Sequence, residues 1–253
     1  MSLIPGGLFD AHLHVIDPRF PLMENQGYRP DPFTVADYRA QTAHIPVVGG
    51  AVVSGSFQGT DTTYLLAALE ELGPSYVGVV QLPDEVTEAT IARLDAVGVR
   101  AARFNVRRGG AAVLDRITEV AALVHAVAGW HVELYVDSRE LAELAPTLRR
   151  LPSVVIDHLG LSAAGLDTLL SLVADGAHVK ATGFGRVDLD VPDALRRIHA
   201  ANPAALMAGT DLPSTRAPRP FEDADLAVVV DALGDDADAA LRGNAVRLYR
   251  PNG

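Results

Sequence analysis

Short apolar runs rich in Val and Ile alternate with longer amphipathic segments along this 253-residue chain, and this alternation constrains the fold more than any other feature. Eight such runs can be counted. The eight expected strands are Leu8–His14, Val47–Val53, Tyr76–Val80, Val99–Phe104, His131–Val136, Val154–Asp157, His178–Thr182 and Leu206–Thr210. Repeated β-α units of this kind build either a doubly wound parallel sheet or a closed (β/α)8 barrel.

The segments between the expected strands have helical periodicity, and several carry capping residues at their ends. The expected helices are Asp61–Leu72, Thr87–Val97, Leu114–Ala128, Ser138–Leu148, Ser162–Ala174, Asp193–Ala201 and Asp235–Tyr249. A doubly wound nucleotide-binding sheet would have a glycine-rich phosphate turn after its first strand. Here the first strand carries His and Asp instead. The sequence therefore predicts an α/β protein with a single (β/α)8 TIM-barrel domain over residues 1–253.

The composition excludes several classes of protein. With 49% apolar and 21% charged residues, the chain can bury a large core, so we expect a soluble, globular protein. The net charge of −11 argues against general binding of nucleic acid or of an anionic membrane. The absence of cysteine excludes thiolate nucleophiles and zinc-thiolate sites. We expect the cytoplasm as the default location and a small molecule as the partner, with a homo-oligomer left open.

Two segments lie outside the β-α pattern. Residues 1–7 precede the first expected strand and are expected to form a short N-terminal extension, in which Met1, Ser2 and Leu3 are typical of a cloning remnant. The stretch Ile16–Pro32 contains four prolines, so we expect an irregular loop over one end of the barrel. That loop is a candidate lid.

Polar side chains end several of the apolar strands, and in a barrel the chemistry sits at the C-terminal strand ends. In the first strand, FDAHLHV, a period of two places Asp10, His12 and His14 on one face. The sixth strand is followed by His158 and the eighth by Asp211. A lone strand-end His is more often structural, and a lone Asp can simply cap a helix. Together, groups from three strands indicate one catalytic site.

Basic and aromatic residues supply a second set of candidates, for binding substrate. Barrel strands are covered on both faces, so Arg103 must reach either the barrel mouth or a buried acidic partner. For Arg107 and Arg108 a solvated position is an equally good explanation. Tyr135, near the end of the fifth strand, can hydrogen-bond a ligand or anchor the rim of the barrel.

The chain contains 21 basic residues, and only one of them, Lys180, is a lysine. Its position in the seventh expected strand places it inside the barrel, where a buried ammonium needs an acidic neighbour such as Glu133, Asp157 or Asp211. The alternative is an ion pair on the exterior. Lys180 and Arg186, which follows in a glycine-spaced loop, complete the candidate substrate-binding residues.

Six motifs in this order resemble the amidohydrolase superfamily: FDAHLHVID, GVRAARFN, the Asp-His-Leu-Gly of VIDHLG, HVKATGFGR, AGTDLP and GNAVRLY. They are similar to the branch that contains 2-pyrone-4,6-dicarboxylate lactonase and sugar lactonases. The resemblance covers nearly the whole chain. It implies a (β/α)8 barrel and a hydrolase that opens the ring of a small carboxylated lactone with base-activated water.

The resemblance also implies roles for the strand-end residues. In the superfamily they commonly hold one or two divalent metals, and here His12, His14, His158 and Asp211 would bind one Zn²⁺ or another divalent ion. Tyr135 stands near where a binuclear site would have a further ligand. The lactonase branch implies that no metal is required. Asp211 is then the base that activates water, and the three histidines are hydrogen-bond donors to the lactone carbonyl.

For the substrate, the family pattern implies that its carboxylates meet Arg103, Arg186, Tyr135 and one of Arg107 or Arg108. Bidentate guanidinium donors suit an anionic lactone.

The chain departs from its relatives at positions where substrate choice is made. Leu212 and Ser214 stand where Trp and His are frequent, and Thr62 stands where Asn is usual. The identity of the lactone therefore stays open. A Zn-dependent amidohydrolase, a sugar lactonase and a non-oxidative decarboxylase are alternatives on the same scaffold. A non-catalytic binding protein would not need an Asp and three His at strand ends.

Overall fold

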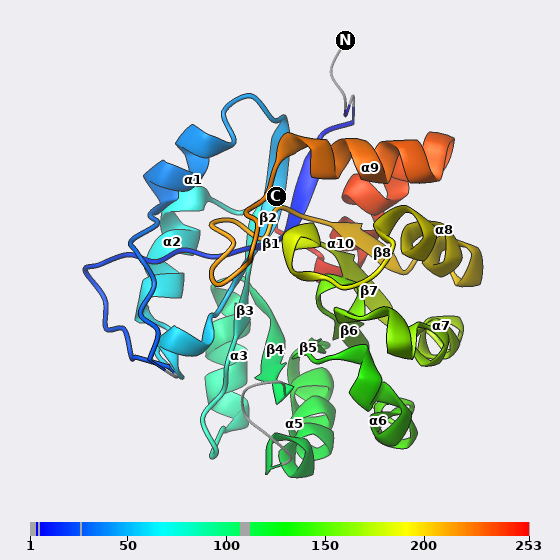
Figure 1. Cartoon of the computed structure of the whole chain (residues 1–253). Coiled ribbons are helices and arrows are strands. Elements are labelled where there is room, and N and C mark those ends of the chain that lie inside the picture. Colours follow the sequence, from blue (N-terminus) through cyan, green and yellow to red (C-terminus); the bar gives the residue numbers. More distant parts are fainter. Residues whose placement is uncertain (1–3, 5, 26, 107–111, 253) are drawn as a thin grey trace.

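The computed structural model describes residues 4, 6–25, 27–106 and 112–252. Within these ranges, eight parallel strands are hydrogen-bonded in chain order, and Figure 1 shows them at the centre of the molecule with the helices around them. The strands are β1 (Leu8–Leu13), β2 (Val47–Val53), β3 (Tyr76–Val80), β4 (Val99–Asn105), β5 (His131–Tyr135), β6 (Val154–Ile156), β7 (His178–Ala181) and β8 (Leu206–Ala208). The predicted (β/α)8 barrel is confirmed, and every strand begins at the residue that the apolar pattern indicates.

The barrel closes where the ends of β1 and β8 meet. The backbone N–H of Asp211 donates to the carbonyl of His12 at 2.7 Å, and the N–H of His14 donates to the carbonyl of Leu212 at 2.8 Å. Closure therefore places the His-x-His end of the first strand beside the Asp that follows the last strand.

The α-helices surround the barrel. The described α-helices are α1 (Val35–Gln41), α2 (Thr63–Leu72), α3 (Glu88–Ala96), α5 (Ala112–Ala128), α6 (Leu141–Leu148), α7 (Leu166–Ala174), α8 (Val191–Ala201), α9 (Asp223–Leu233) and α10 (Asn244–Tyr249). The sequence pattern does not predict α1, which is too short to show a period, or α9, whose apolar residues form a run instead of a stripe.

The expected helix over Asp235–Tyr249 is interrupted. A 3₁₀ turn at Gly234–Asp236 and a π-helical turn at Ala239–Gly243 precede α10. From α10, Tyr249 enters the barrel and stacks on Phe9, with 5.8 Å between the ring centroids. Phe9 lies near the start of β1, so α10 closes the end of the barrel opposite to the strand ends that carry His12 and Asp211.

A β-bulge in β1 corrects one prediction. Between Asp10 and Leu13 the strand advances by three residues while β2 advances by two, from Gly50 to Val52, so the two-residue alternation is broken. The carboxylate of Asp10 turns to the hydroxyl of Tyr38 on α1, at 3.1 Å. The prediction that Asp10 shares a face with the two histidines of β1 is therefore wrong.

The same carboxylate joins the ends of β1 and β8. It accepts from the backbone N–H of Thr210 at 2.8 Å and from the hydroxyl of Thr210 at 2.7 Å. Burial raises the pKa of Asp10 to about 6.

The proline-rich loop after β1 lies at the end of the barrel where β2 and β8 finish. The N–H of Met23 donates to the carbonyl of Phe57 at 2.8 Å, and the guanidinium of Arg216, which follows β8, lies 4.4 Å from the ring centroid of Tyr28. The expected loop is thus in place, and its role as a lid stays a prediction.

At the N-terminus, Met1–Leu3 lie outside the described residues, and Ile4 is buried in the core. None of the described helices combines the length and the apolar character needed to cross a lipid bilayer.

Candidate active site

Four predicted residues converge at the mouth of the barrel. The Nε2 atoms of His12, His14 and His158 lie 3.8, 3.7 and 4.0 Å from Oδ1 of Asp211, and all four side chains are buried. His12 lies on β1, His14 directly follows it, and the turns after β6 and β8 supply His158 and Asp211. The arrangement follows from barrel closure, because the C-terminal ends of parallel strands share one rim.

Two of these residues have backbone conformations that non-glycine residues rarely adopt. The φ angles of His158 and Asp211 are 51° and 59°, in the left-handed region. Each such residue costs about 1–3 kcal/mol and persists only where the surrounding structure imposes its conformation, and such residues cluster at functional sites. The turns therefore aim these side chains at the mouth at the expense of local stability.

Asp211 forms a buried ion pair with Arg186. The Nε of Arg186 lies 3.0 Å from Oδ2 of Asp211, and a second guanidinium nitrogen also contacts Oδ2. Burial alone would raise the pKa of Asp211, but the guanidinium and the neighbouring His158 lower it well below its usual range. Asp211 is therefore ionised, with Oδ1 facing the three imidazoles.

The Nδ1 atoms of two imidazoles form hydrogen bonds, and the bond of His14 fixes the tautomer of its ring. Nδ1 of His14 lies 2.7 Å from the carbonyl of Val53, which only accepts, so Nδ1 carries the proton and the neutral ring has its lone pair on Nε2. In this tautomer Nε2 of His14 has no proton to donate, and the donor role expected from the sequence requires the doubly protonated ring. His158 pairs through Nδ1 with the hydroxyl of Thr182 at 2.8 Å, and burial lowers its pKa to about 4.

Arg103 satisfies both sequence expectations, since it reaches a buried acid and also lines the mouth. Its Nη2 and Nε lie 2.9 and 3.3 Å from Oδ2 of Asp157, and its Nη1 donates to the carbonyl of Ser54 at 2.7 Å. The guanidinium also lies 5.7 Å from the ring centroid of Tyr135. Burial opposes ionisation of Asp157, but Arg103 and Lys180 lower the pKa of its carboxyl.

Lys180 lies beneath the mouth in the barrel interior, fully buried. Its Nζ is 2.5 Å from Oε2 of Glu133 and 3.7 Å from Oδ1 of Asp157, which confirms the predicted interior position and two of the predicted partners. Glu133 also contacts the hydroxyl of Tyr249 and the Nε2 of His131. Burial would raise the pKa of Glu133, but Lys180 and His131 lower it to about 2.

A small cavity opens at three of the four converging residues, His14, His158 and Asp211. Its lining includes Arg103, Tyr135 and Arg186 from the predicted substrate-binding set, whereas His12 and Lys180 are not part of its wall. The remaining lining residues are His14, Gly55, Ser56, Phe57, Asn105, His158, Asp211 and Thr215. Sequence reasoning missed Ser56, Phe57 and Thr215 because they lie in loops, where no periodicity marks an inward residue. Arg107 and Arg108 lie outside the described residues.

A neighbouring cavity of about 220 Å³ shares Ser56, Arg103 and Asn105 with the first and extends it toward the proline-rich loop at Asn25. The first cavity measures only about 20 Å³, so the neighbouring cavity provides most of the space at the mouth.

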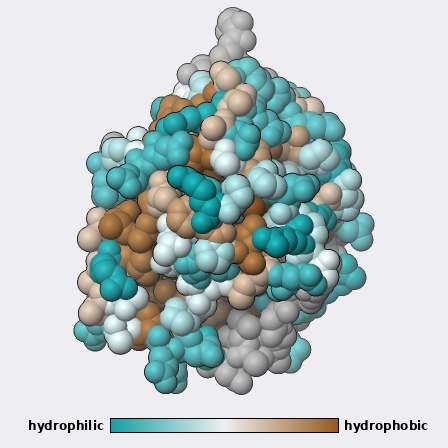
Figure 2. Space-filling view, turned by 90° about the vertical axis from the view of Figure 1, so that its left-hand side faces the viewer, coloured by the Kyte–Doolittle hydropathy of each residue, from teal (hydrophilic) through white to brown (hydrophobic). Residues whose placement is uncertain are grey.

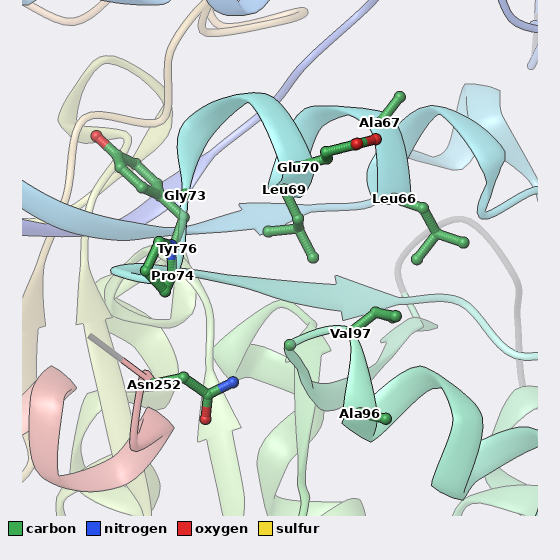
Figure 3. A pocket seen from close by; sticks show the side chains of 11 residues that line it. Leu66, Ala67, Leu69, Glu70, Gly73, Pro74, Tyr76, Ala96, Val97 and Asn252 are labelled. Atoms are coloured by element: carbon green, nitrogen blue, oxygen red, sulfur yellow. The ribbon is translucent and has the colours of Figure 1, made fainter.

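A larger cavity of about 570 Å³ lies away from the mouth, between α2 and α3. Figure 3 shows Leu66 and Leu69 of α2, Val97 after α3 and Asn252 near the C-terminus around it. It belongs to the side of the molecule seen in Figure 2, where hydrophobic residues gather among hydrophilic ones. No group of titratable side chains like that at the barrel mouth lines this cavity, so the mouth is the candidate site.

A sequence model of the amidohydrolase family matches residues 9–250, which include nearly all of the barrel. The chain belongs to the amidohydrolase family. The 2-pyrone-4,6-dicarboxylate hydrolase of Comamonas testosteroni is 32% identical over 162 residues, which cover 62% of this amidohydrolase and 53% of that protein. The matched segment thus spans about half the length of this relative.

For two further relatives, the matched region covers a larger share of the relative's own length. The 4-sulfomuconolactone hydrolase of Rhizobium radiobacter is 26% identical over 231 residues, which cover 83% of this chain and 77% of that protein. A crystal structure of an Agrobacterium tumefaciens protein in its apo form superposes with a TM-score of 0.86 at 26% identity, covering 98% of this amidohydrolase and 97% of that chain.

The site of this amidohydrolase has donors of the kind that bind one divalent cation. Imidazole nitrogens and a carboxylate are typical Zn²⁺ ligands. Among the described side chains, His12 Nε2 and Asp211 Oδ1 are buried polar atoms without a hydrogen-bond partner, and they face each other together with His14 and His158. The donor types fit. The ligand atoms of His12, His158 and Asp211 all lie within 4.8 Å of one another, and these residues would hold the ion, with His14 beside Asp211 as a further donor. When bound, such an ion polarises a carbonyl and lowers the pKa of bound water.

A second grouping of ligand-type atoms, from His12, Glu133 and Asp157, surrounds Nζ of Lys180. The ammonium already supplies the positive charge at that place, so this grouping offers no cation site.

Proposed function

We propose that this amidohydrolase hydrolyses the ester bond of a small, anionic lactone with water activated by Asp211. One observation carries the proposal: Oδ1 of an ionised, buried Asp211 faces three imidazole Nε2 atoms at the open end of the barrel. Ester hydrolysis needs a base for the attacking water and donors for the charge that grows on the carbonyl oxygen. Both kinds of group are present within one small space.

The anionic character of the substrate is supported by the two guanidinium groups in the cavity wall, Arg103 and Arg186. They supply cationic donors in a chain with a net charge of −11, and planar guanidinium groups suit carboxylate or sulfonate groups. The names of two relatives, 2-pyrone-4,6-dicarboxylate hydrolase and 4-sulfomuconolactone hydrolase, describe anionic ring compounds. A carboxylated lactone is therefore the substrate class that we propose.

The attacking water fits between two acceptors. Oδ1 of Asp211 and Nε2 of His14, which carries a lone pair in the Nδ1–H tautomer, lie 3.7 Å apart, so one water can donate a hydrogen bond to each. The water oxygen then attacks the lactone carbonyl carbon while one of its protons passes to Asp211. Nε2 of His12 and Nε2 of His158 face the same Oδ1 at 3.8 and 4.0 Å, and an N–H at either position can donate to the carbonyl oxygen.

Ring opening completes the reaction. The tetrahedral intermediate expels the ring oxygen, the C–O ester bond breaks, and the proton held by Asp211 passes to the leaving oxygen. The net change is the addition of one water to give a hydroxy acid or its keto tautomer. Arg103 and Arg186 hold the substrate's anionic groups, and Asp157 keeps Arg103 in place through its ion pair.

The test is an assay of ring opening with 2-pyrone-4,6-dicarboxylate, a sulfonated muconolactone and a neutral sugar lactone, read as loss of lactone and appearance of the acid. We expect hydrolysis of an anionic lactone in preference to the neutral one. Asp211→Asn should lower kcat by about 10²–10⁴, the usual contribution of a general base. The matched control is Asp223→Asn, at an exposed carboxylate paired with His44 on the surface, which should keep wild-type kcat. Release of CO₂ in place of hydrolysis, or equal rates for both Asp variants, contradicts the proposal.

A further inference from the structure

Lys180, the single lysine of the chain, takes no direct part in the proposed reaction, yet it touches the site from below. Its Nζ lies 3.4 Å from Nδ1 of His12, in hydrogen-bonding geometry, as well as against the carboxylates of Glu133 and Asp157. The charges balance: Lys180 and Arg103 are positive, and the two carboxylates are negative. Such balance is what allows four charges to be buried together.

In the contact between Lys180 and His12, the donor and the acceptor can be assigned. An ammonium has three donors and no lone pair, so at Nδ1 of His12 it must meet a lone pair. A ring with a lone pair on Nδ1 is not protonated on both nitrogens, so His12 is neutral. A neutral imidazole with its lone pair on Nδ1 carries its proton on Nε2, the nitrogen that faces Asp211.

A competing partner would require the opposite tautomer. Oδ1 of Asp157 lies 3.5 Å from Nδ1 of His12, and an N–H at Nδ1 could donate to it. Oδ2 of Asp157 accepts hydrogen bonds from Arg103. Among the described residues, Oδ1 of Asp157 forms no hydrogen bond. Only the contact with Lys180 has the geometry of a hydrogen bond, so the geometry favours the proton on Nε2.

We propose that Lys180 is a positioning residue that holds His12 as its Nε2–H tautomer, so that His12 enters the reaction as a hydrogen-bond donor and not as a ligand of a divalent cation. The catalytic meaning of this assignment rests on the proposed function. His14 has the opposite tautomer, because its Nδ1 donates to Val53. The two histidines of the His-x-His pair thus present one donor and one acceptor to the water and the carbonyl.

The same contact weakens cation binding at the mouth. To ligate a cation through Nε2, His12 would have to move its proton to Nδ1, where it would point at the ammonium of Lys180. The four-donor arrangement then loses one ligand in the neutral, resting protein, although its donor types fit a cation.

The tautomer can be read directly. Protein labelled with ¹⁵N at histidine is examined by long-range ¹H–¹⁵N correlation, which distinguishes a protonated ring nitrogen from an unprotonated one, and His12 is assigned by comparison with His12→Gln. We expect Nε2–H for His12 and Nδ1–H for His14 in the wild type. His14 serves as an internal reference because its partner, Val53, is untouched by the variants below.

The decisive variant is Lys180→Met combined with Glu133→Gln, which removes one positive and one negative charge and leaves the net charge unchanged. His12 should then shift to Nδ1–H and donate to Asp157. The matched control is Tyr249→Phe, which removes a hydroxyl from the same buried cluster without touching His12 and should leave its tautomer as in the wild type. If the double variant does not fold, the tautomer of His12 in the wild type still decides, because a proton on Nδ1 there overturns the proposal.

Zinc affinity gives a second readout that does not depend on turnover. Competition against a chromophoric chelator should show Zn²⁺ binding at least about 10-fold tighter in the double variant than in the wild type or in Tyr249→Phe, the usual size of an effect on a ligand's supporting contact. A wild-type His12 protonated on Nδ1, or a double variant with unchanged tautomer and Zn²⁺ affinity, overturns the proposal whether or not the protein opens lactones. An Nε2–H His12 that responds to the variants in a protein that hydrolyses no lactone supports the tautomer assignment and refutes the proposed function.

Discussion

The guanidinium of Arg186 contacts only one of the two carboxylate oxygens of Asp211. Nε approaches Oδ2 to 3.0 Å, while Oδ1 is left to the three imidazoles at 3.7 to 4.0 Å. The two oxygen atoms of this carboxylate therefore have different roles. The ion pair on Oδ2 keeps the group ionised in a buried position, and Oδ1 is available to a water molecule.

This division predicts how the pH dependence changes when Arg186 is replaced by Gln. Without the guanidinium, burial is opposed more weakly, so the pKa of Asp211 rises, and a base with a higher pKa is protonated at higher pH. In the wild type the acid limb of kcat should lie below pH 4, because the pKa of Asp211 is well below its usual range, and in Arg186→Gln it should move upward toward the measured window. Profiles of kcat between pH 4 and 8 should therefore be flat at their acid end for the wild type and fall there for Arg186→Gln. Arg197→Gln, at an exposed pair on α8, should give the wild-type profile. An unmoved acid limb in Arg186→Gln would show that Asp211 is not the titrating base.

The buried pair of Arg103 and Asp157 predicts a large loss of stability when one partner is removed. Arg103→Met leaves the carboxylate of Asp157 in the interior without its guanidinium, which should lower the free energy of unfolding by about 3–5 kcal/mol. Urea denaturation measures the loss. The control, Arg197→Met, breaks a pair whose Asp167 is 92% exposed and should cost less than about 1 kcal/mol. Adding Asp157→Asn to Arg103→Met should restore part of the stability. A loss as small as that of the control would contradict the electrostatic role.

Much of this barrel could be predicted from the sequence, because strands buried on both faces give continuous apolar runs. The starts of all eight strands follow from those runs, and the polar residues that interrupt or follow them identify His12, His14, His158 and Asp211.

The remaining features depend on contacts that periodicity does not record. A bulge turns Asp10 away from the face that strict alternation assigns to it. The proton on His14 is fixed by the carbonyl of Val53, on another strand. Ser56 and Phe57 line the cavity from a loop, and loops have no repeat that separates inward from outward residues.

Acid should destabilise this protein in part through His178, at the start of β7. Burial lowers the pKa of His178 to about 4 from its ordinary value of 6.5. Between these two values the unfolded chain binds a proton that the folded chain does not, so lowering the pH from about 6.5 to about 4 favours unfolding.

The free energy of unfolding of His178→Gln should therefore fall less than that of the wild type as the pH is lowered across that window. Above pH 6.5 the two proteins should show the same dependence of this free energy on pH. Asp10 and His158 also titrate in the window, but they contribute equally to both proteins, so the difference between the two curves isolates His178. Unfolding free energies measured by urea at closely spaced pH values give the comparison. His44→Gln, at an exposed histidine, should follow the wild-type curve. Parallel curves for His178→Gln and the wild type would rule out this contribution.

Removal of divalent metals should leave lactone hydrolysis intact. The proposed reaction draws its base from Asp211 and its donors from the imidazoles, and the contact between Lys180 and His12 works against cation binding through Nε2. Protein dialysed exhaustively against a strong chelator, with its residual metal content measured, should keep wild-type kcat, and added Zn²⁺ should not raise it.

The informative comparison is the Lys180→Met and Glu133→Gln double variant, in which Zn²⁺ should bind more tightly and alter turnover. Loss of wild-type activity on chelation, with recovery on adding Zn²⁺, would instead identify His12, His14, His158 and Asp211 as metal ligands. Because the same four side chains serve either chemistry, metal content and turnover must be measured on the same sample.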